Sequence, residues 1–299
     1  MKFSLIIPTY NRTKELGKCI HSILSQTLLA SELVIIDDGN LPSGLLSQIK
    51  KRLEDKEIGF VYYKKNHQKE RRGLSESKNV AIKIIRNEVF FILDDDLILD
   101  NDFFEKIMNV WKNNGNPNLI GVGGIIKNNR KKGFLEKTYN KIFGLTSKYE
   151  WDINDVGFQV WDEGIKERKK GYYAHGGVCS YNKPLVEKLG GFTTFSGGRT
   201  ANEDVDFCLR AKNKGYFFIM EPEAKVIHKQ SKTSKEGEFL MGFKESYNRK
   251  IIFKNNCKKI FKTRLWFYWA NVGWILRQFS VGHFERGAGM IKGFLMPII

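Results

Sequence analysis

The sequence predicts an α/β fold built on a doubly wound, mainly parallel sheet. Short, almost wholly apolar runs alternate with segments whose apolar residues recur at helical spacing over the first third of the 299-residue chain. Continuous apolar runs are typical of parallel strands that helices bury on both faces. The expected strands are Phe3–Ile7, Leu33–Ile36, Phe60–Tyr63 and Val89–Leu93.

Helices are expected between these strands. Pro8 is expected to end the first strand, and Thr13 to cap the helix that follows it. A strongly basic loop at residues 64–74 precedes the third helix, which begins at Ser75. The helices expected in this part of the chain cover residues 13–27, 45–53, 75–86 and 101–111.

The second half of the sequence is less regular. A strand is expected at residues 120–126, after which the periodicity weakens into a long irregular region at 127–168. The elements expected beyond it are a helix at 183–189, a glycine-containing loop at 196–198, a helix opening at 202–206, and short strands at 217–220 and 224–227.

The strand at 89–93 runs directly into three consecutive carboxylates, Asp94, Asp95 and Asp96. Like charges this close repel unless water or a cation neutralises them, and Mg²⁺ or Mn²⁺ prefers oxygen ligands. The alternative is an acidic loop that merely solvates the end of a strand. Ligands of doubly wound sheets bind beyond the carboxyl ends of the strands. We therefore expect the triplet to meet two other polar strand ends, at residues 8–10 and 37–38, on one rim.

Charge and cysteine content limit the possible partners and compartment. The net charge of +17 is concentrated at the C-terminus, where residues 225–299 carry 15 Lys and Arg against 4 Asp and Glu. This excess favours an anionic partner, whether nucleic acid, phospholipid head groups or a phosphorylated substrate. Four widely separated cysteines, with no secretory signal and no long apolar run, favour a cytosolic protein without a transmembrane helix.

A series of motifs follows in a recognisable order over residues 3–230: Ile6–Arg12, Val34–Gly39, Ser77–Asn79, Leu93–Asp96, Gly176–Gly177, Gly190–Phe192, Asn202–Asp206 with Arg210, and Val226–His228. In this order and spacing they resemble the family 2 glycosyltransferases of the GT-A fold, which depend on nucleotide sugars and are usually inverting. The resemblance implies a GT-A catalytic domain at residues 1–230, followed by a C-terminal extension at 231–299.

The resemblance also implies a donor site and a metal site. One of Asp37 and Asp38 would hold the nucleotide base, and the acidic triplet is similar to the family's DxD motif. Asp94, Asp96 and His228 would then hold Mn²⁺ or Mg²⁺ against the diphosphate, the alternative for His228 being a satisfied histidine at a strand end. The residues implied in binding the nucleotide sugar are Pro8, Thr9, Tyr10, Arg12, Asp37, Asp38, Lys78, Asp94 and Asp95.

Two positions depart from the family pattern. Lys78 stands where many members have arginine, which keeps the charge but loses the bidentate fork. Residues 40–42 are Asn, Leu and Pro, where a serine-rich continuation is more usual. The sequence therefore leaves the choice among UDP, GDP and dTDP sugars open.

Catalytic roles follow from the same resemblance. Asp204 is similar to the general base that takes the proton from the acceptor hydroxyl, and Glu203 is expected to help position the acceptor. The alternative is that both acids merely complement the dipole at a helix N-terminus. Gly176, Gly177 and Trp161 are the residues expected near the acceptor.

The C-terminal extension combines basic and aromatic residues. The run Leu265–Leu276 is too short to span a membrane, yet it is aromatic and flanked by cations, as in a helix lying in the head-group layer of an anionic membrane. Residues 293–299 are expected to add a second contact. The alternative is that the aromatic face packs on the catalytic domain or on a partner subunit. Membrane contact would place the protein in the cytoplasm, at the inner face of the cell membrane, acting on a saccharide or polyprenyl-linked acceptor.

Two other function classes explain less of the pattern. A non-catalytic protein that binds nucleic acid or an anionic membrane would explain the charge but not the acidic strand ends, because carboxylates repel phosphates unless a metal intervenes. A sugar nucleotidyltransferase would normally carry a glycine-rich phosphate loop after the first strand, which residues 8–12 do not form. We therefore expect an inverting, metal-dependent sugar transfer in cell-surface polysaccharide or glycan synthesis, without a nucleic-acid partner.

Overall fold

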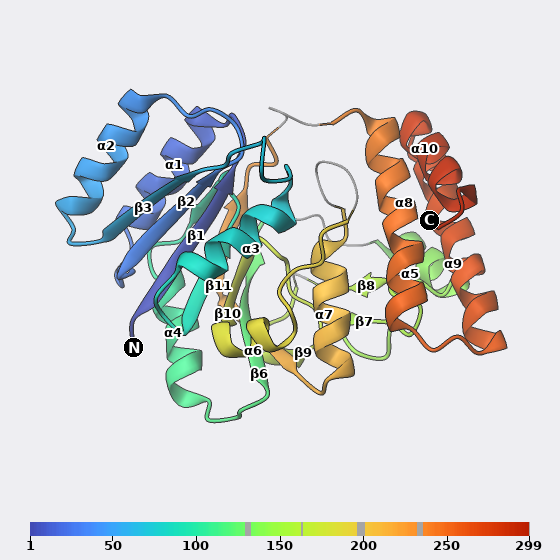
Figure 1. Ribbon diagram of the computed structural model, residues 1–299. Coiled ribbons are helices and arrows are strands. Elements are labelled where there is room, and N and C mark those ends of the chain that lie inside the picture. The colour runs from blue at the N-terminus through green and yellow to red at the C-terminus, as the bar shows by residue number, and fades with distance from the viewer. Residues whose placement is uncertain (129–132, 163, 196–200, 232–235, 299) are drawn as a thin grey trace.

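The computed structural model describes residues 1–128, 133–162, 164–195, 201–231 and 236–298. The glycine-containing loop expected at 196–198 and the last residue of the expected 293–299 contact lie outside these ranges. Figure 1 shows a central sheet with helices on both faces, and a group of C-terminal helices at the end of the molecule opposite α2.

The central sheet is mixed but mainly parallel, as expected. Its strands run in the order β3-β2-β1-β4-β10-β6-β11-β5, and β9 pairs with β11. The neighbours β3, β2, β1 and β4 are parallel, and so are β6 and β11, whereas β10 lies antiparallel between β4 and β6. The strands are β1 (Phe3–Thr9), β2 (Glu32–Asp37), β3 (Gly59–Lys64), β4 (Val89–Leu93), β5 (Leu97–Leu99), β6 (Leu119–Ile126), β9 (Lys169–Gly171), β10 (Val178–Asn182) and β11 (Phe217–His228), with β7 (Asp152–Ile153) and β8 (Gln159–Val160) forming a separate ribbon.

Successive strand residues point to opposite faces of the sheet. Because most of the strands are largely apolar, both faces carry apolar side chains, and helices bury both. Leu5 of β1 joins one core cluster with residues of α1, α2 and α4, whereas Ile6 joins a second cluster with residues of α3, α6 and α7. The helices are α1 (Thr13–Leu24), α2 (Ser43–Glu54), α3 (Leu74–Ile84), α4 (Phe103–Asn113), α5 (Phe134–Ile142), α6 (Lys183–Lys188), α7 (Glu203–Asn213), α8 (Glu238–Asn256), α9 (Phe261–Ser280) and α10 (Phe284–Leu295).

Two local expectations near the first strand are wrong. Pro8 does not end β1, which continues to Thr9 and pairs with β2 there. The pairing of β1 with β4 stops at Ile6, so Pro8 lies where only one side of the strand is paired, and its missing N–H is tolerated. Thr13 is the first residue of α1 and does not cap it, because Arg12 occupies the N-cap position.

The region 127–168 is more ordered than its weak periodicity indicated. It contains α5 and the β7–β8 ribbon, and Trp151 beside that ribbon is fully buried. The two short strands expected at 217–220 and 224–227 are one strand, β11, whose register with β6 shifts between Met220 and Lys225. A short strand or helix has too few residues to show a hydrophobic period. It can be recognised only from the elements that it pairs with or packs against, and the sequence does not show which these are.

The C-terminal helices pack against the rest of the chain through one side. Glycines let α10 approach α8 closely, since a Cβ on Gly289 would lie 1.9 Å from the Phe239 carbonyl oxygen. The inner side of α9 brings Phe267 and Ala270 into a third core cluster with Phe158 and Phe253. Packing on the catalytic domain, one of the two alternatives for the aromatic run, therefore holds for this side of α9. Within the described residues no helix is both long enough and apolar enough to cross a membrane. The division at residue 230 stays a prediction.

Candidate active site

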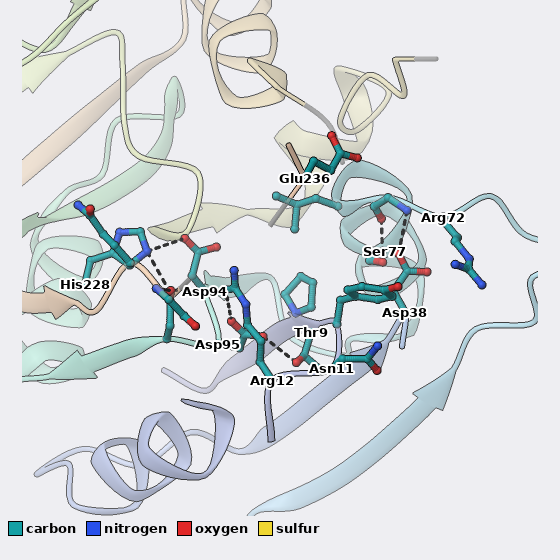
Figure 2. A pocket seen from close by; sticks show the side chains of 17 residues that line it. Thr9, Asn11, Arg12, Asp38, Arg72, Ser77, Asp94, Asp95, His228 and Glu236 are labelled. Carbon is teal, nitrogen blue, oxygen red and sulfur yellow. Dashed lines mark hydrogen bonds and ion pairs between the residues drawn. The ribbon is translucent and has the colours of Figure 1, made fainter. Parts of the chain in front are cut away.

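A cavity of about 840 Å³ lies at the carboxyl ends of β1, β2 and β4, where the sequence predicted that polar strand ends would meet (Figure 2). Its lining comes from all three strand ends, from the segment that leads into α3 with the first turn of that helix, and from the segment that follows β11. The predicted residues that line it are Pro8, Thr9, Tyr10, Arg12, Asp38, Asp94, Asp95, Asp96 and His228. Arg72, Ser77, Gln230, Ser231 and Glu236 also line it and were not predicted to contact a ligand.

Asp95 points into the protein. It accepts hydrogen bonds from Thr9 Oγ1 at 2.7 Å and from Arg12 Nη1 at 2.9 Å. Burial raises the pKa of Asp95 to about 6, although Arg12 and Thr9 act in the opposite direction. The middle carboxylate of the triplet is therefore paired within the protein, mainly with Arg12 and Thr9.

Asp94, Asp96 and His228 form a cluster whose three donor atoms lie within 4.8 Å of one another. His228 Nε2 is 3.0 Å from Asp96 Oδ1 and 3.9 Å from Asp94 Oδ2 (Figure 2). Asp96 Oδ2 accepts the Ser231 N–H at 2.8 Å, while Asp96 Oδ1 is buried and receives no well-directed hydrogen bond from any described residue.

The charges in this cluster are mutually dependent. Burial alone would raise the pKa of Asp96, but His228, the Ser231 N–H and Arg12 outweigh burial and lower it. Burial alone would also lower the pKa of His228, but Asp96 and Asp94 outweigh it and raise that pKa. Two carboxylates and an imidazole whose donor atoms lie this close together fit a divalent cation such as Mn²⁺ or Mg²⁺.

Two glycines before β10 make room for the acidic side chains on either side. A Cβ on Gly177 would lie 2.2 Å from Asp94 Cγ, and the Gly177 carbonyl accepts the Asp94 N–H at 3.0 Å. A Cβ on Gly176 would lie 2.9 Å from Asp204 Cβ. Without side chains, the two glycines let Asp94 and Asp204 lie close to the backbone on either side of them. This packing explains why glycine stands at both positions, whether or not an acceptor binds there.

The first turn of α7 carries the two predicted catalytic acids in different surroundings. Asp204 is half-buried and accepts hydrogen bonds from Tyr173 Oη at 3.0 Å and from the Val205 N–H at 2.8 Å. Glu203 is buried and pairs with Lys78 Nζ at 3.1 Å. The partner Tyr173 was not predicted, because it lies 31 residues from Asp204 and no spacing signal connects the two.

Lys78 lies beneath the site and is not part of the cavity lining, so its predicted contact with the donor is not reproduced. Lys78 is 1% exposed, and its ammonium group also donates to the Gly176 carbonyl at 3.3 Å. Burial alone would lower the pKa of Lys78, but Glu203, Asp94 and Asp204 outweigh it and raise that pKa. Burial raises the pKa of Glu203, although Lys78 opposes the rise. The buried ammonium group of Lys78 thus lies between Asp94 and the two acids of α7 and interacts electrostatically with all three.

The structure separates Asp37 from Asp38. Asp37 is fully buried and accepts hydrogen bonds from the Gly39 and Leu41 N–H groups and from Tyr62 Oη, so it does not reach the cavity. Asp38 lines the cavity, where Lys65 lies 3.0 Å away and the Gly73 N–H donates at 2.8 Å. Of the two candidates for the nucleotide base, only Asp38 is at the cavity.

Trp161 belongs to an aromatic group beside Asp204. Its ring lies 5.8 Å from Tyr173 and 5.5 Å from His175, measured between ring centroids. Tyr173 in turn bonds Asp204, so the group adjoins the acidic start of α7. Trp161 is not among the residues that line the cavity, and its place near an acceptor stays a prediction.

Comparison with known proteins identifies relatives with related chemistry. The family model described as glycosyl transferase family 2 matches residues 4–168, and that of glycosyl transferase family group 2 matches residues 89–288. The glucosyl-dolichyl phosphate glucuronosyltransferase of Haloferax volcanii is 25% identical over 84% of this chain and 77% of its own length. The poly(ribitol-phosphate) beta-N-acetylglucosaminyltransferase TarP of Staphylococcus aureus is 25% identical over 86% of this chain and 76% of its own length.

Solved structures share the fold. A mannosyltransferase from Pyrobaculum calidifontis, in complex with GDP-Man and Mn²⁺, superimposes with a TM-score of 0.56 at 16% identity, over 98% of this chain and 79% of that one. Residues 1–349 of S. aureus TarS, in complex with UDP-GlcNAc, give a TM-score of 0.62 at 14% identity, over 98% and 79% of the two chains.

Proposed function

Because the chain belongs to glycosyl transferase family 2 and has the GT-A fold, we propose that it moves a sugar from a nucleotide-diphosphate sugar to an acceptor hydroxyl, with inversion and with a divalent cation. The family makes it a glycosyltransferase. The observation that carries the finer proposal is the cluster of Asp94, Asp96 and His228 at the cavity, whose three donor atoms lie within 4.8 Å of one another.

The donor is proposed to lie along residues 8–10. Asp38 and His228 lie at opposite ends of the cavity in Figure 2, so the base is assigned to the Asp38 end and the diphosphate to the His228 end. A cavity of about 840 Å³ is in the usual size range for a small-molecule site. Arg12 acts here by holding Asp95, and Lys78 acts from beneath the site through Glu203.

Asp94, Asp96 and His228 are proposed to hold the cation. Bound there, Mn²⁺ or Mg²⁺ supplies positive charge that stabilises the departing diphosphate. The Pyrobaculum mannosyltransferase has Mn²⁺ and GDP-Man in its complex, which supports this assignment for a chain of the same fold.

Asp204 is proposed to be the general base. It takes the proton from the acceptor hydroxyl as that oxygen bonds to the anomeric carbon, while the bond from this carbon to the diphosphate oxygen breaks and the nucleoside diphosphate leaves with the electron pair. Tyr173 and the Val205 N–H fix the orientation of the carboxylate. Glu203, which pairs with Lys78, is proposed to help position the acceptor, and Trp161 is the proposed contact for an acceptor sugar ring.

The acceptor is proposed to be a saccharide or a polyprenyl-linked saccharide in cell-surface glycan synthesis. The support is that one relative is named for a glucosyl-dolichyl phosphate acceptor and another for poly(ribitol-phosphate). We further propose that the protein works in the cytoplasm at the inner face of the cell membrane, with residues 231–299 making a peripheral contact.

Purified protein should be tested against UDP, GDP and dTDP sugars with Mn²⁺, with Mg²⁺ and with chelator, with membrane extract as the acceptor source. Asp96→Asn and Asp204→Asn are compared with Asp102→Asn, a matched change at a surface carboxylate that pairs with Lys106. We expect metal-dependent release of nucleoside diphosphate from one donor, lost in Asp96→Asn and unchanged in Asp102→Asn.

The two site variants should fail differently. Asp204→Asn should still bind the donor with metal but should transfer sugar more slowly by on the order of 10²–10⁴-fold, since only the general base is removed. If no donor is cleaved or bound in the presence of metal, and the membrane extract changes nothing, the proposed function is wrong.

A further inference from the structure

Helices α9 and α10 form an antiparallel hairpin on the outside of the molecule. Tyr268 lies edge-on to Phe294 with ring centroids 5.6 Å apart, and Phe279 lies 6.1 Å from Phe284 beside the turn. Contacts at both ends of the pair mean that the helices run side by side. Figure 1 shows them at the far end of the molecule from α2.

The outer side of this hairpin is apolar and exposed. On α9 the large apolar side chains that are 41% to 77% exposed are Phe261, Leu265, Tyr268, Trp269, Val272 and Leu276. At 100° per residue these positions fall within an arc of about 100°, so they form one continuous stripe.

The outer side of α10 has the same character. Phe284, Ile291 and Leu295, at intervals of seven and four residues, are exposed on one side of that helix. The Tyr268–Phe294 contact joins the two stripes near Leu295, and we call the combined surface the hairpin face.

The hairpin face is distinct from the surface that packs on the catalytic domain. The opposite side of α9 carries Phe267 and Ala270, which are buried against Phe253 and Phe158. On the inner side, Tyr139 of α5 donates a hydrogen bond to the Gly273 carbonyl. Trp269, at the edge of the stripe, is 50% exposed and also donates to the Ile142 carbonyl, so it belongs to both sides. The contacts that attach α9 to the rest of the protein therefore lie mainly on its inner side. An exposed stripe of this length on a soluble helix therefore indicates a partner.

The positive charge around the hairpin face favours an anionic bilayer over a second copy of the chain as its partner. Between Lys250 and Lys292 the chain carries nine Lys and Arg against a single acid, Glu285. Lys258, Lys259 and Lys262 are exposed at the start of α9, next to the apolar stripe. A second copy of the chain would bring the same cations opposite one another, whereas an anionic bilayer offers phosphates for the cations and hydrocarbon for the stripe.

We infer that the hairpin face lies on an anionic lipid bilayer, with α9 and α10 parallel to the surface, their apolar side chains among the acyl chains and the lysines at the phosphates. This inference extends the peripheral contact of the proposed function to a defined surface, but it does not depend on the proposed sugar transfer. The helices rest in the interface and do not cross the bilayer.

The test is binding of the full chain to vesicles of pure phosphatidylcholine or of phosphatidylcholine with phosphatidylglycerol, measured by flotation without any donor or acceptor. The triple variant Lys258→Gln, Lys259→Gln and Lys262→Gln removes three cations from the segment beside the hairpin face. Its matched control is Lys50→Gln, Lys51→Gln and Lys56→Gln, which removes the same charge from exposed lysines in and after α2, at the other end of the molecule.

We expect binding to phosphatidylglycerol vesicles that falls by roughly 100-fold in the α9 triple variant and stays within a few-fold of the original in the α2 control. Leu265→Ser with Val272→Ser should weaken binding on the order of 10-fold or more, because these side chains then bury less apolar surface. Circular dichroism melts should match those of the original protein, since all five side chains are exposed.

Three outcomes would overturn the inference. The first is no binding to anionic vesicles, and the second is equal loss in the α9 and α2 triple variants. The third is a dimer in light scattering that Leu265→Ser with Val272→Ser dissociates, which would assign the hairpin face to a second copy. Since no substrate is present, these results are independent of whether sugar transfer is observed.

Discussion

Replacing Lys78 by Met should destabilise the protein strongly, because it leaves the buried carboxylate of Glu203 without its cation. Lys78 is 1% exposed and lies 3.1 Å from Glu203, which is itself 7% exposed. Methionine keeps most of the length and the apolar packing of the lysine stem. Removing one partner of a buried pair costs about 3–5 kcal/mol, so we expect a loss of that size in the free energy of unfolding at pH 8.

The loss should depend on pH in a defined direction. The folded-state pKa of Glu203 is already above its ordinary value of 4.5, and removal of Lys78 raises it further. A carboxyl group with a raised folded-state pKa binds more protons in the folded than in the unfolded state, so stability falls as pH rises from 4.5 through that raised pKa. The Lys78→Met variant should therefore recover part of its stability at pH 5 compared with pH 8.

Urea unfolding followed by tryptophan fluorescence and far-UV circular dichroism measures this effect. Lys50→Met is the matched control, because Lys50 pairs with Glu54 on the surface, where such pairs are worth about 0.5 kcal/mol or less. Adding Glu203→Gln to Lys78→Met should restore at least about half of the lost stability. A loss below about 1 kcal/mol, or no recovery in the double variant, would refute the idea that this pair is a coupled buried unit.

Three further changes test other parts of the structure. Gly177→Ala should abolish binding of Mn²⁺ to the purified protein while leaving the melting temperature within a few degrees, because the new Cβ would lie 2.2 Å from Asp94 Cγ; unchanged metal affinity by calorimetry would contradict this. Gly289→Val should lower the free energy of unfolding by about 1–3 kcal/mol or more and expose α10 to proteolysis, because the new Cβ would collide with the Phe239 carbonyl. A protease-resistant variant would disprove the close packing of α10 on α8. Asp37→Ala should lower the unfolding free energy by about 1–3 kcal/mol by leaving buried donors unpaired, whereas Asp38→Ala should weaken donor binding with a smaller effect on stability; the reverse pattern would show that the two roles were assigned wrongly.

The sheet and the rim of the site were predictable because they depend on local patterns. Apolar runs identify strands that are buried on both faces, and carboxyl ends of parallel strands must lie at one edge. The prediction that residues 8–10 and 94–96 would converge is confirmed by the cavity that they share. The failures near Pro8 and in residues 127–168 arose where an element has too few residues to show a period or depends on which neighbour pairs with it.

The choice between adjacent or similar residues was made by tertiary structure. Asp37 and Asp38 are equivalent in the sequence, but Asp37 is the last residue of β2 and is buried in the interior, whereas Asp38 follows the strand and lines the cavity. Lys78 was expected at the donor, yet its helix directs it beneath the site toward Glu203. Tyr173 could not be connected with Asp204 at all, because a hydrogen bond between distant segments leaves no periodic trace.

The sequence by itself determined the fold class, the strand ends that carry the chemistry and the family to which the chain belongs, since apolar periodicity and the order of motifs are properties of the chain alone. Only the tertiary structure decided which carboxylates pair with Lys78 and with Arg12, which lie together beside His228, and which side of α9 is left exposed. The physical reason is that pairing and burial depend on residues far apart in the sequence, and their positions are fixed only when the whole sheet and its helices have packed.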